Sequence, residues 1–355
     1  MASPLSRGPA APQPTGEPLE RGSSATVRVG TSFSSHRAAY LGLEPRSAFQ
    51  RVLELGFRLL RISAYWNDVA ASGYGELDWQ MEQAARAAQP VLLTVGMKAI
   101  QYPEFYIPPA LVPTAPGRGG RIGDDPVLRQ AVLRFVRDTV ERYVGQSTLV
   151  AWQVENEPFN RAGPRRWWLD PDLVHQEIAA VRDLDGRPIV VNTFAHFNVL
   201  VDWSSRPHRG LFDLVGLVPE REALEALAAL GPSGVLGTDV YTRIGISFLG
   251  WEFVRKAAPD WADRCRFWLE TARAQGHEAW IIESQAEPWE PSLRTYDRPR
   301  TFDPASTVEM YQRLVEAGFR TLLLWGCEYW LWRTDAGDSR WLQAARDILA
   351  GAGQR

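Results

Sequence analysis

From residue 26 onward, short apolar runs alternate with longer stretches in which apolar positions recur every three or four residues. A run of four to eight apolar residues is typical of a buried strand, and the longer period is typical of a helix that buries one face. The chain predicts eight strands, at Thr26–Phe33, Arg58–Ile62, Val91–Val95, Leu149–Val154, Pro188–Asn192, Val235–Val240, Ala279–Ile282 and Thr321–Leu324. It predicts eight helices, at Arg46–Leu55, Trp79–Ala88, Pro126–Tyr143, Asp172–Arg182, Glu220–Leu230, Trp261–Gln275, Thr307–Ala317 and Arg340–Ala350.

Each predicted strand is followed by a predicted helix, which is the order of a parallel sheet with helical crossovers. Eight such units predict an α/β fold, a single (β/α)8 TIM barrel. A doubly wound sheet would more often carry a Gly-rich phosphate turn after its first strand, and no G-x-G-x-x-G follows Val29. Leu211–Val218 could form a further strand, but the pattern around it favours Val235–Val240 as the sixth.

Composition and charge narrow the class of protein. Of 355 residues, 45% are hydrophobic and 23% are charged, with no apolar run of membrane-spanning length, so we expect a globular protein and no membrane partner. The 39 basic and 42 acidic residues give a formal charge of -3 without a basic block, so we expect no nucleic-acid partner. The oligomeric state is left open.

Residues 1–25 are rich in Pro, Gly, Ser and Ala and predict a disordered tail, which leaves a barrel domain at residues 26–355. This tail lacks the apolar segment of a secretory signal. Cys265 and Cys327 stand alone, 62 positions apart, and match no disulfide framework or metal motif. We expect a cytoplasmic protein, although a mature secreted form would share these features.

In a (β/α)8 barrel the catalytic groups lie at the C-terminal ends of the strands. Polar and aromatic residues gather at these positions: Arg61, Trp66, Lys98, Gln101, Asn156, Glu157, Asn192, His196, Asp239, Tyr241, Glu283, Gln285, Trp325 and Glu328. The sequence therefore predicts a polar cup with aromatic walls.

Two glutamates in this set suggest a reaction. Glu157 leaves the fourth strand just before Pro158, and Glu283 ends the seventh, so their carboxyls can face each other across the lumen. Glycoside hydrolysis needs one protonated carboxyl for the leaving oxygen and one ionised carboxylate at the sugar ring. A separation of about 5 to 5.5 Å gives retention of configuration, and about 6.5 to 9.5 Å gives inversion.

The run Asn156-Glu157-Pro158 after the fourth strand, with Glu283 after the seventh, resembles the clan A retaining glycoside hydrolases, which include cellulases, mannanases and β-glycosidases. The resemblance covers residues 26–352. It implies that Glu157 is the acid/base, that Glu283 is the nucleophile and that Asn156 binds the sugar 2-hydroxyl.

Three more positions match the pattern of the clan. The resemblance implies that Tyr241 holds the nucleophile, that Arg61 lies near it and that Trp325 forms the floor under the sugar. Cellulase-type members usually carry a histidine two residues before the strand-six tyrosine, where this chain has Asp239. The third strand ends in Lys98 and Gln101 where a histidine is common, so subfamily and substrate stay open.

Further sugar contacts are expected from the loops. The candidates are Trp66, Lys98, His196, Trp289 and Glu328. Aromatic rings suit the apolar faces of sugars, and the chain has 15 Trp. Glu155 is expected to be structural, paired with Arg61 or another barrel residue. Since His, Asp and Glu show no metal-ligand spacing, we expect no metal and no cofactor.

These observations predict a retaining glycoside hydrolase that cleaves β-linked glycosides or oligosaccharides by double displacement, with carbohydrate as its partner. Two alternatives stay open. One is a transglycosylase on the same scaffold, in which an acceptor replaces water. The other is a carbohydrate-binding barrel without turnover.

Overall fold

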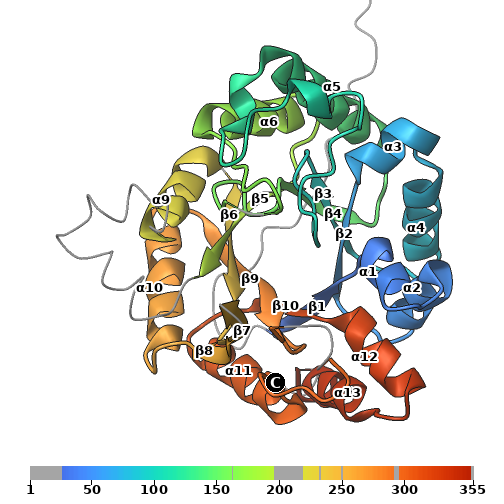
Figure 1. Ribbon diagram of the computed structural model, residues 1–355, viewed down its shortest axis with the longest axis vertical. Coiled ribbons are helices and arrows are strands. Elements are labelled where there is room, and N and C mark those ends of the chain that lie inside the picture. Colours follow the sequence, from blue (N-terminus) through green and yellow to red (C-terminus); the bar gives the residue numbers. More distant parts are fainter. Residues whose placement is uncertain are drawn as a thin grey trace, which may run out of the picture.

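The computed structural model describes residues 26–161, 163–195, 219–231, 233–248, 251–291 and 296–352. Eight parallel strands close into a barrel in the order β1-β2-β3-β4-β5-β6-β9-β10, and β10 pairs again with β1 (Figure 1). They are β1 Arg28–Ser32, β2 Leu59–Ser63, β3 Val91–Val95, β4 Leu149–Val154, β5 Ile189–Ala195, β6 Gly234–Val240, β9 Glu278–Gln285 and β10 Thr321–Trp325. The predicted (β/α)8 barrel is confirmed.

A ring of helices surrounds the strands (Figure 1). The eight predicted helices are α2 Pro45–Leu53, α4 Gly75–Arg86, α5 Pro126–Tyr143, α6 Pro171–Arg182, α9 Pro219–Leu230, α10 Trp261–Ala274, α11 Pro304–Glu316 and α13 Arg340–Ala352. Three of them begin at an Asp-Pro step. The carboxylates of Asp125, Asp170 and Asp303 each accept from a backbone N–H of the first turn. The proline that follows occupies the first helical position, where a backbone N–H would have no partner within the helix, so its missing N–H costs nothing.

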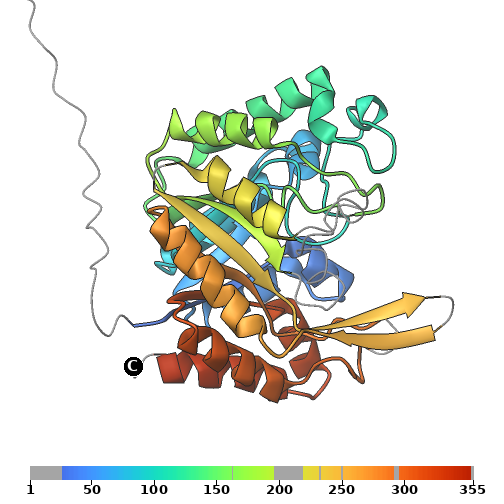
Figure 2. The ribbon, with the colours of Figure 1, turned by 90° about the vertical axis from the view of Figure 1, so that its left-hand side faces the viewer.

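Several elements were not predicted. Short helices follow three strands, α1 Ser35–Tyr40, α3 Trp66–Ser72 and α12 Cys327–Asp335, and the long β3–α5 connection contains two 3-10 turns, Val112–Thr114 and Ile122–Asp124. After β6, β7 Arg243–Phe248 and β8 Trp251–Lys256 form an antiparallel hairpin. Figure 2 shows this hairpin extending outward beyond the barrel on the side to which the strands point. The predicted tail and the segment Leu211–Val218 lie outside the described residues.

The barrel interior has an apolar lower layer and a polar upper layer. The lower layer is a cluster of buried side chains: Leu59, Leu92, Ala151, Val190, Val235, Trp280, Ile282 and Leu323. Two residues further along β2, β3 and β5, and so on the same face of each strand, lie Arg61, Thr94 and Asn192, which are also buried. The alternation of each strand therefore aims polar groups at the C-terminal end of the barrel.

The helices pack around the outside of the strands through a larger apolar cluster. Within the described ranges, none of the helices combines enough length with enough apolar character to cross a membrane.

Candidate active site

A cavity of about 480 Å³ opens at the C-terminal end of the barrel. Its lining comes from loops after several strands and from the hairpin: Arg37, Gln101, Tyr102, Glu104, Asn156, Glu157, Asn160, Phe194, Tyr241, Ile244, Ile246, Arg255, Glu283, Glu287, Pro288, Trp289, Tyr296 and Trp325. The structure thus brings Glu157 and Glu283 to one cavity, together with five other residues singled out in the sequence: Gln101, Asn156, Tyr241, Trp289 and Trp325.

Glu283 lies near the end of β9 and is held on both carboxylate oxygens. Its Oε1 accepts from Nη1 of the fully buried Arg61 at 2.7 Å, and its Oε2 accepts from the hydroxyl of Tyr241 at 2.6 Å. Burial raises the pKa of Glu283, while the hydrogen bonds from Arg61 and Tyr241 act in the opposite direction. These contacts fix the carboxylate in one orientation, as a nucleophile requires.

Glu157 follows β4 in a conformation that non-glycine residues rarely adopt. Its φ is +46°, and the φ of Glu155 is +59°. Such backbone costs of the order of 1 to 3 kcal/mol per residue and persists only where the surroundings hold it. Here the ammonium of Lys98 donates to the Glu157 carbonyl at 2.6 Å, and the Glu157 N–H donates to Asn192 Oδ1 at 2.8 Å. Asn160 Nδ2 donates to the carboxylate itself at 3.0 Å.

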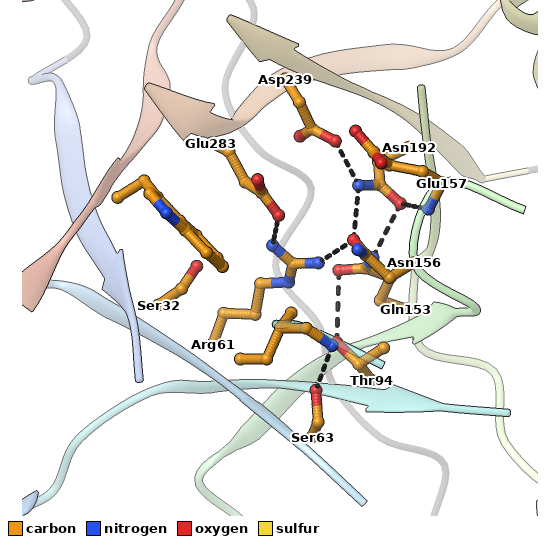
Figure 3. Close-up of polar contacts among 12 residues, drawn as sticks. Ser32, Arg61, Ser63, Thr94, Gln153, Asn156, Glu157, Asn192, Asp239 and Glu283 are labelled. Carbon is orange, nitrogen blue, oxygen red and sulfur yellow. Dashed lines mark hydrogen bonds and ion pairs between the residues drawn. The ribbon is translucent and has the colours of Figure 1, made fainter. Parts of the chain in front are cut away.

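The side-chain amide of Asn192 joins the two glutamates into one network (Figure 3). Its Nδ2 donates to Asn156 Oδ1 at 3.0 Å and to Asp239 Oδ2 at 2.6 Å. Asn156 Oδ1 also accepts from Arg61 Nη2 at 2.6 Å, which leads to Glu283. Gly237 makes room for this amide, because a Cβ there would lie 2.6 Å from the Cβ of Asn192.

Asp239 takes the position at which the sequence departs from the cellulase pattern. It is fully buried, and its Oδ2 accepts from Nδ2 of Asn192, while its carboxyl lies near that of Glu157. Burial, with the charges of Glu283 and Glu157, raises the pKa of Asp239 well above its usual range. This shift favours the protonated, neutral form of the Asp239 carboxyl. Figure 3 shows both carboxyls beside the amide of Asn192.

Comparison with known proteins shows which solved structures share this fold. No protein-family model and no curated protein matches the sequence. Among solved structures, the exo-β-1,4-mannosidase Op5Man5 from Opitutaceae bacterium strain TAV5 is similar, with 15% identity and a TM-score of 0.55 over 86% of this chain and 55% of that one. The cold-adapted β-galactosidase from Rahnella sp. R3 has 12% identity and a TM-score of 0.60 over 94% and 56%.

A third similar structure is GH5_18 from Streptomyces cattleya in complex with GlcNAc, with 12% identity and a TM-score of 0.54 over 85% of this chain and 71% of that one. The chain shares the (β/α)8 barrel fold of these structures. It spans little more than half the length of the first two structures. At these identities the likeness concerns the barrel and not its substrates.

Aromatic rings form one wall of the cavity. Tyr241 stacks on Phe194, with ring centroids 5.5 Å apart, and meets Trp289 edge to face at 5.0 Å. Trp325, at the end of β10, lines the cavity and donates from its Nε1 to Glu287 Oε1 at 3.2 Å. Trp289 and Trp325 therefore lie where sugar stacking was predicted.

Other predicted sugar contacts lie elsewhere. Trp66 begins α3, is buried and stacks on Phe135 of α5 with centroids 5.5 Å apart, so it packs one helix against another. Lys98 is fully buried beneath the cavity, where its ammonium holds the carbonyls of Glu157 and Asn160. It positions Glu157 and does not line the cavity. His196 lies outside the described residues.

Glu328 is likewise a support and not part of the lining. It lies in the first turn of α12, is buried and accepts from the backbone N–H of Ser34 at 2.5 Å. Burial raises the pKa of Glu328 from about 4.5 to about 7. Between these two values the folded protein binds more protons than the unfolded chain, so the free energy of unfolding falls as the pH rises through this window.

We therefore expect Glu328→Gln, which keeps an acceptor for Ser34 but cannot ionise, to unfold at a higher temperature than the wild type at pH 8 and at a similar temperature at pH 5. A difference of one pKa unit corresponds to about 1.4 kcal/mol, so the gain at pH 8 should be about 1 kcal/mol or more. Thermal unfolding followed by circular dichroism measures it. Glu82→Gln, on the exposed face of α4, is the control, and an identical pH dependence in Glu328→Gln and wild type would contradict the expectation.

Glu155 contacts other residues of the barrel and not Arg61, the first of its expected partners. Its carboxylate accepts from the N–H groups of Met97 at 2.9 Å and Lys98 at 2.5 Å and forms a hydrogen bond with the carboxyl of Glu177. Burial raises the pKa of Glu155 to about 7. The geometry depends on Gly96, since a Cβ there would lie 2.3 Å from the Glu155 carboxylate.

The sequence did not point to several groups in the cavity. Arg37 on α1 pairs with Glu287 at 3.2 Å, and both side chains are largely buried. Glu104 lies 3.5 Å from the Lys98 ammonium, and burial raises its pKa to about 7. Glu287 carried a signal, since it follows β9 by two residues. Arg37 and Glu104 carried no such signal, because Arg37 lies on a short helix that was not predicted and Glu104 lies in a loop.

The arrangement as a whole suits acid–base and nucleophilic chemistry on a polar ligand. One glutamate is fixed by two donors, the other lies near the buried carboxyl of Asp239, and aromatic rings line the same cavity. Among the described residues, no cluster of three or more His, Cys, Asp or Glu is arranged to hold a metal ion.

Proposed function

We propose that the protein is a retaining glycoside hydrolase that cleaves β-linked glycosides or short oligosaccharides by double displacement. The observation that carries this proposal is the pair of glutamates in one cavity, with Glu283 held by Arg61 and Tyr241 and Glu157 held by Asn160. A fixed carboxylate and a second carboxyl that can give and take a proton are the two groups that this reaction needs.

In the first half-reaction, the Glu157 carboxyl gives its proton to the glycosidic oxygen while a carboxylate oxygen of Glu283 attacks the anomeric carbon. The bond from that carbon to the leaving oxygen breaks, the alcohol departs, and a glycosyl ester forms on Glu283. Arg61 and Tyr241 hold Glu283 in line for the attack. As the ester forms and the charge on Glu283 falls, their hydrogen bonds weaken.

In the second half-reaction, a water enters from the side that the alcohol left. Glu157, now ionised, takes a proton from this water as its oxygen bonds to the anomeric carbon, and the ester bond to Glu283 breaks. Two inversions give net retention. Asn156, held by Arg61 and Asn192, presents its amide to the cavity for a sugar hydroxyl, and Trp325 and Trp289 offer rings to the sugar.

The test is turnover and stereochemistry with wild-type protein. A panel of nitrophenyl β-glucoside, β-galactoside and β-mannoside, with short β-linked oligosaccharides of the same sugars, identifies the sugar. Proton NMR of the first product then decides the mechanism. The β-anomer before mutarotation is expected, and the α-anomer would overturn retention. Methyl glycoside formed in added methanol measures transfer, and binding without turnover across the panel would favour the carbohydrate-binding barrel.

The raised pKa of Asp239 makes a prediction for Asp239→Asn. Asparagine can still accept from Asn192, but it cannot carry the negative charge that an ionised Asp239 places near Glu157. We expect the alkaline limb of the kcat/KM profile to move to lower pH by about one unit or more, because a like charge raises the pKa of its neighbour. Profiles on the best substrate of the panel measure this shift, and superimposable alkaline limbs would refute it.

A further inference from the structure

The β7–β8 hairpin has one face of apolar side chains. In its antiparallel register Ile244 pairs with Arg255 and Ile246 pairs with Phe253. Directly paired residues share a face of the ribbon, and so do alternate residues of a strand, which adds Trp251. This face, defined by Ile244, Ile246, Trp251, Phe253 and Arg255, is called the hairpin face below.

The hairpin face continues the wall of the cavity. Ile244, Ile246 and Arg255 line the cavity that holds the two glutamates, whereas Trp251 and Phe253 lie further out and are 79% and 48% exposed. In Figure 2 the hairpin extends away from the barrel body. Arg255 and Trp251 are four positions apart on the same strand, so at about 3.4 Å per residue the hairpin face is about 13 Å long.

The opposite face of the hairpin has a different character. Ser247, Glu252 and Lys256 are exposed there, and Glu252 forms a 2.6 Å ion pair with Arg300. A ribbon that only met water would carry polar groups on both faces. Two exposed aromatic rings on the side that continues the cavity therefore indicate a surface that a ligand covers.

Arg255 is the one charged group of the hairpin face. Its guanidinium is half-buried, and burial lowers its pKa. Within the part of the chain that the structure describes, no carboxylate pairs with it. A half-buried guanidinium without a carboxylate partner is stabilised by stacking on the face of an aromatic ring or by donating a hydrogen bond to an oxygen attached to that ring.

We propose that the hairpin face binds the leaving group of the substrate and that this leaving group is an extended aromatic aglycone of two or more rings. The inference rests on the proposed function. The ring next to the scissile oxygen stacks on Arg255 between Ile244 and Ile246, and the distal ring lies against Phe253 and Trp251. Further sugar residues fit less well, since each brings several hydroxyls and the hairpin face offers one polar side chain.

The experiment compares three substrates that share the sugar identified by the panel: the glycosyl fluoride, the phenyl glycoside and the 4-biphenylyl glycoside. Fluoride does not reach the hairpin, and the two phenols have similar acidity. We expect wild-type kcat/KM to be about tenfold or more higher for biphenylyl than for phenyl glycoside. In Trp251→Ala/Phe253→Ala this advantage disappears. Arg255→Met lowers kcat/KM for both aryl glycosides, and the fluoride is turned over at the wild-type rate by Trp251→Ala/Phe253→Ala.

Ser247→Ala, on the opposite face of the same ribbon, is the matched control and keeps the biphenylyl preference. Three results would overturn the proposal: a biphenylyl preference that survives the double variant, a loss that affects β-linked oligosaccharides instead, or a dimer in sedimentation that dissociates on Trp251→Ala. If the wild type turns over none of the three substrates, the proposed function fails by itself. Calorimetric titration with the biphenylyl glycoside then tests separately whether the hairpin face binds the aglycone. Binding to the wild type that is lost in the double variant supports the proposal, and no binding to the wild type refutes it.

Discussion

Glu283→Gln is expected to reduce kcat/KM by roughly four orders of magnitude or more on every substrate, since removing a covalent nucleophile has effects of that size. Glutamine has the same shape, its amide oxygen still accepts from Arg61 and its NH2 group can donate to the Tyr241 hydroxyl, but the amide cannot form the glycosyl ester. The loss should therefore be independent of the leaving group. Rates on a nitrophenyl and a dinitrophenyl glycoside of the preferred sugar measure it.

Two measurements make this result specific. Glu283→Gln should still unfold in one cooperative thermal transition, because the side chain keeps its volume and its amide can pair with both Arg61 and Tyr241. Glu287→Gln removes a second cavity carboxylate, one that pairs with Arg37 and accepts from Trp325. If Glu287→Gln lost activity to the same extent while Glu283→Gln kept a substantial rate, the nucleophile would be Glu287.

Glu157→Gln is expected to lower kcat/KM by about 10²- to 10⁴-fold on glycosides with poor leaving groups, which is the usual contribution of general acid catalysis. The loss should be much smaller on a dinitrophenyl glycoside, since dinitrophenolate leaves without a proton. With that substrate the glycosyl ester forms faster than it hydrolyses, because no general base activates water. A burst of dinitrophenol equal to the enzyme concentration, followed by a slow steady state, is the expected trace.

This dependence on the leaving group separates the two glutamates. A loss of equal size on good and poor leaving groups in Glu157→Gln would show that Glu157 does not protonate the leaving oxygen. Lys98→Met gives a related comparison, because it frees the Glu157 carbonyl without changing the carboxyl. Its defect should follow the pattern of Glu157→Gln, together with a lower unfolding temperature from the loss of a buried charge contact.

The barrel was readable from the sequence because its strands are short, buried and separated by amphipathic helices. The helix boundaries were less clear, since Pro171 and Pro304 begin helices that periodicity placed one and three residues later. The Asp-Pro step before each of them was a usable signal. The hairpin also carried one, an alternation of apolar and polar residues over 243–256, but a chain assumed to alternate strands and helices left no place for it.

The two cavity glutamates, Glu157 and Glu283, were predicted from their positions at two strand ends, whereas the contacts around them were not. Trp66, Lys98 and Glu328 follow strands just as Glu157 does, yet all three point into packed structure. Sequence gives the distance of a residue from a strand, but not the direction that an irregular turn gives its side chain. The partner of Glu155 was missed for a related reason, because Glu177 lies on α6 and approaches through tertiary packing alone.

The left-handed backbone at Glu155 and Glu157 has an evolutionary consequence. A glycine adopts this conformation without strain, so at position 157 the residue that best suits the chain and the residue that suits the chemistry are different. Drift under selection for folding alone would favour losing the glutamate. The carboxyl proposed for catalysis at position 157 is therefore held at a cost in backbone strain, which leaves the chain less margin for destabilising substitutions elsewhere.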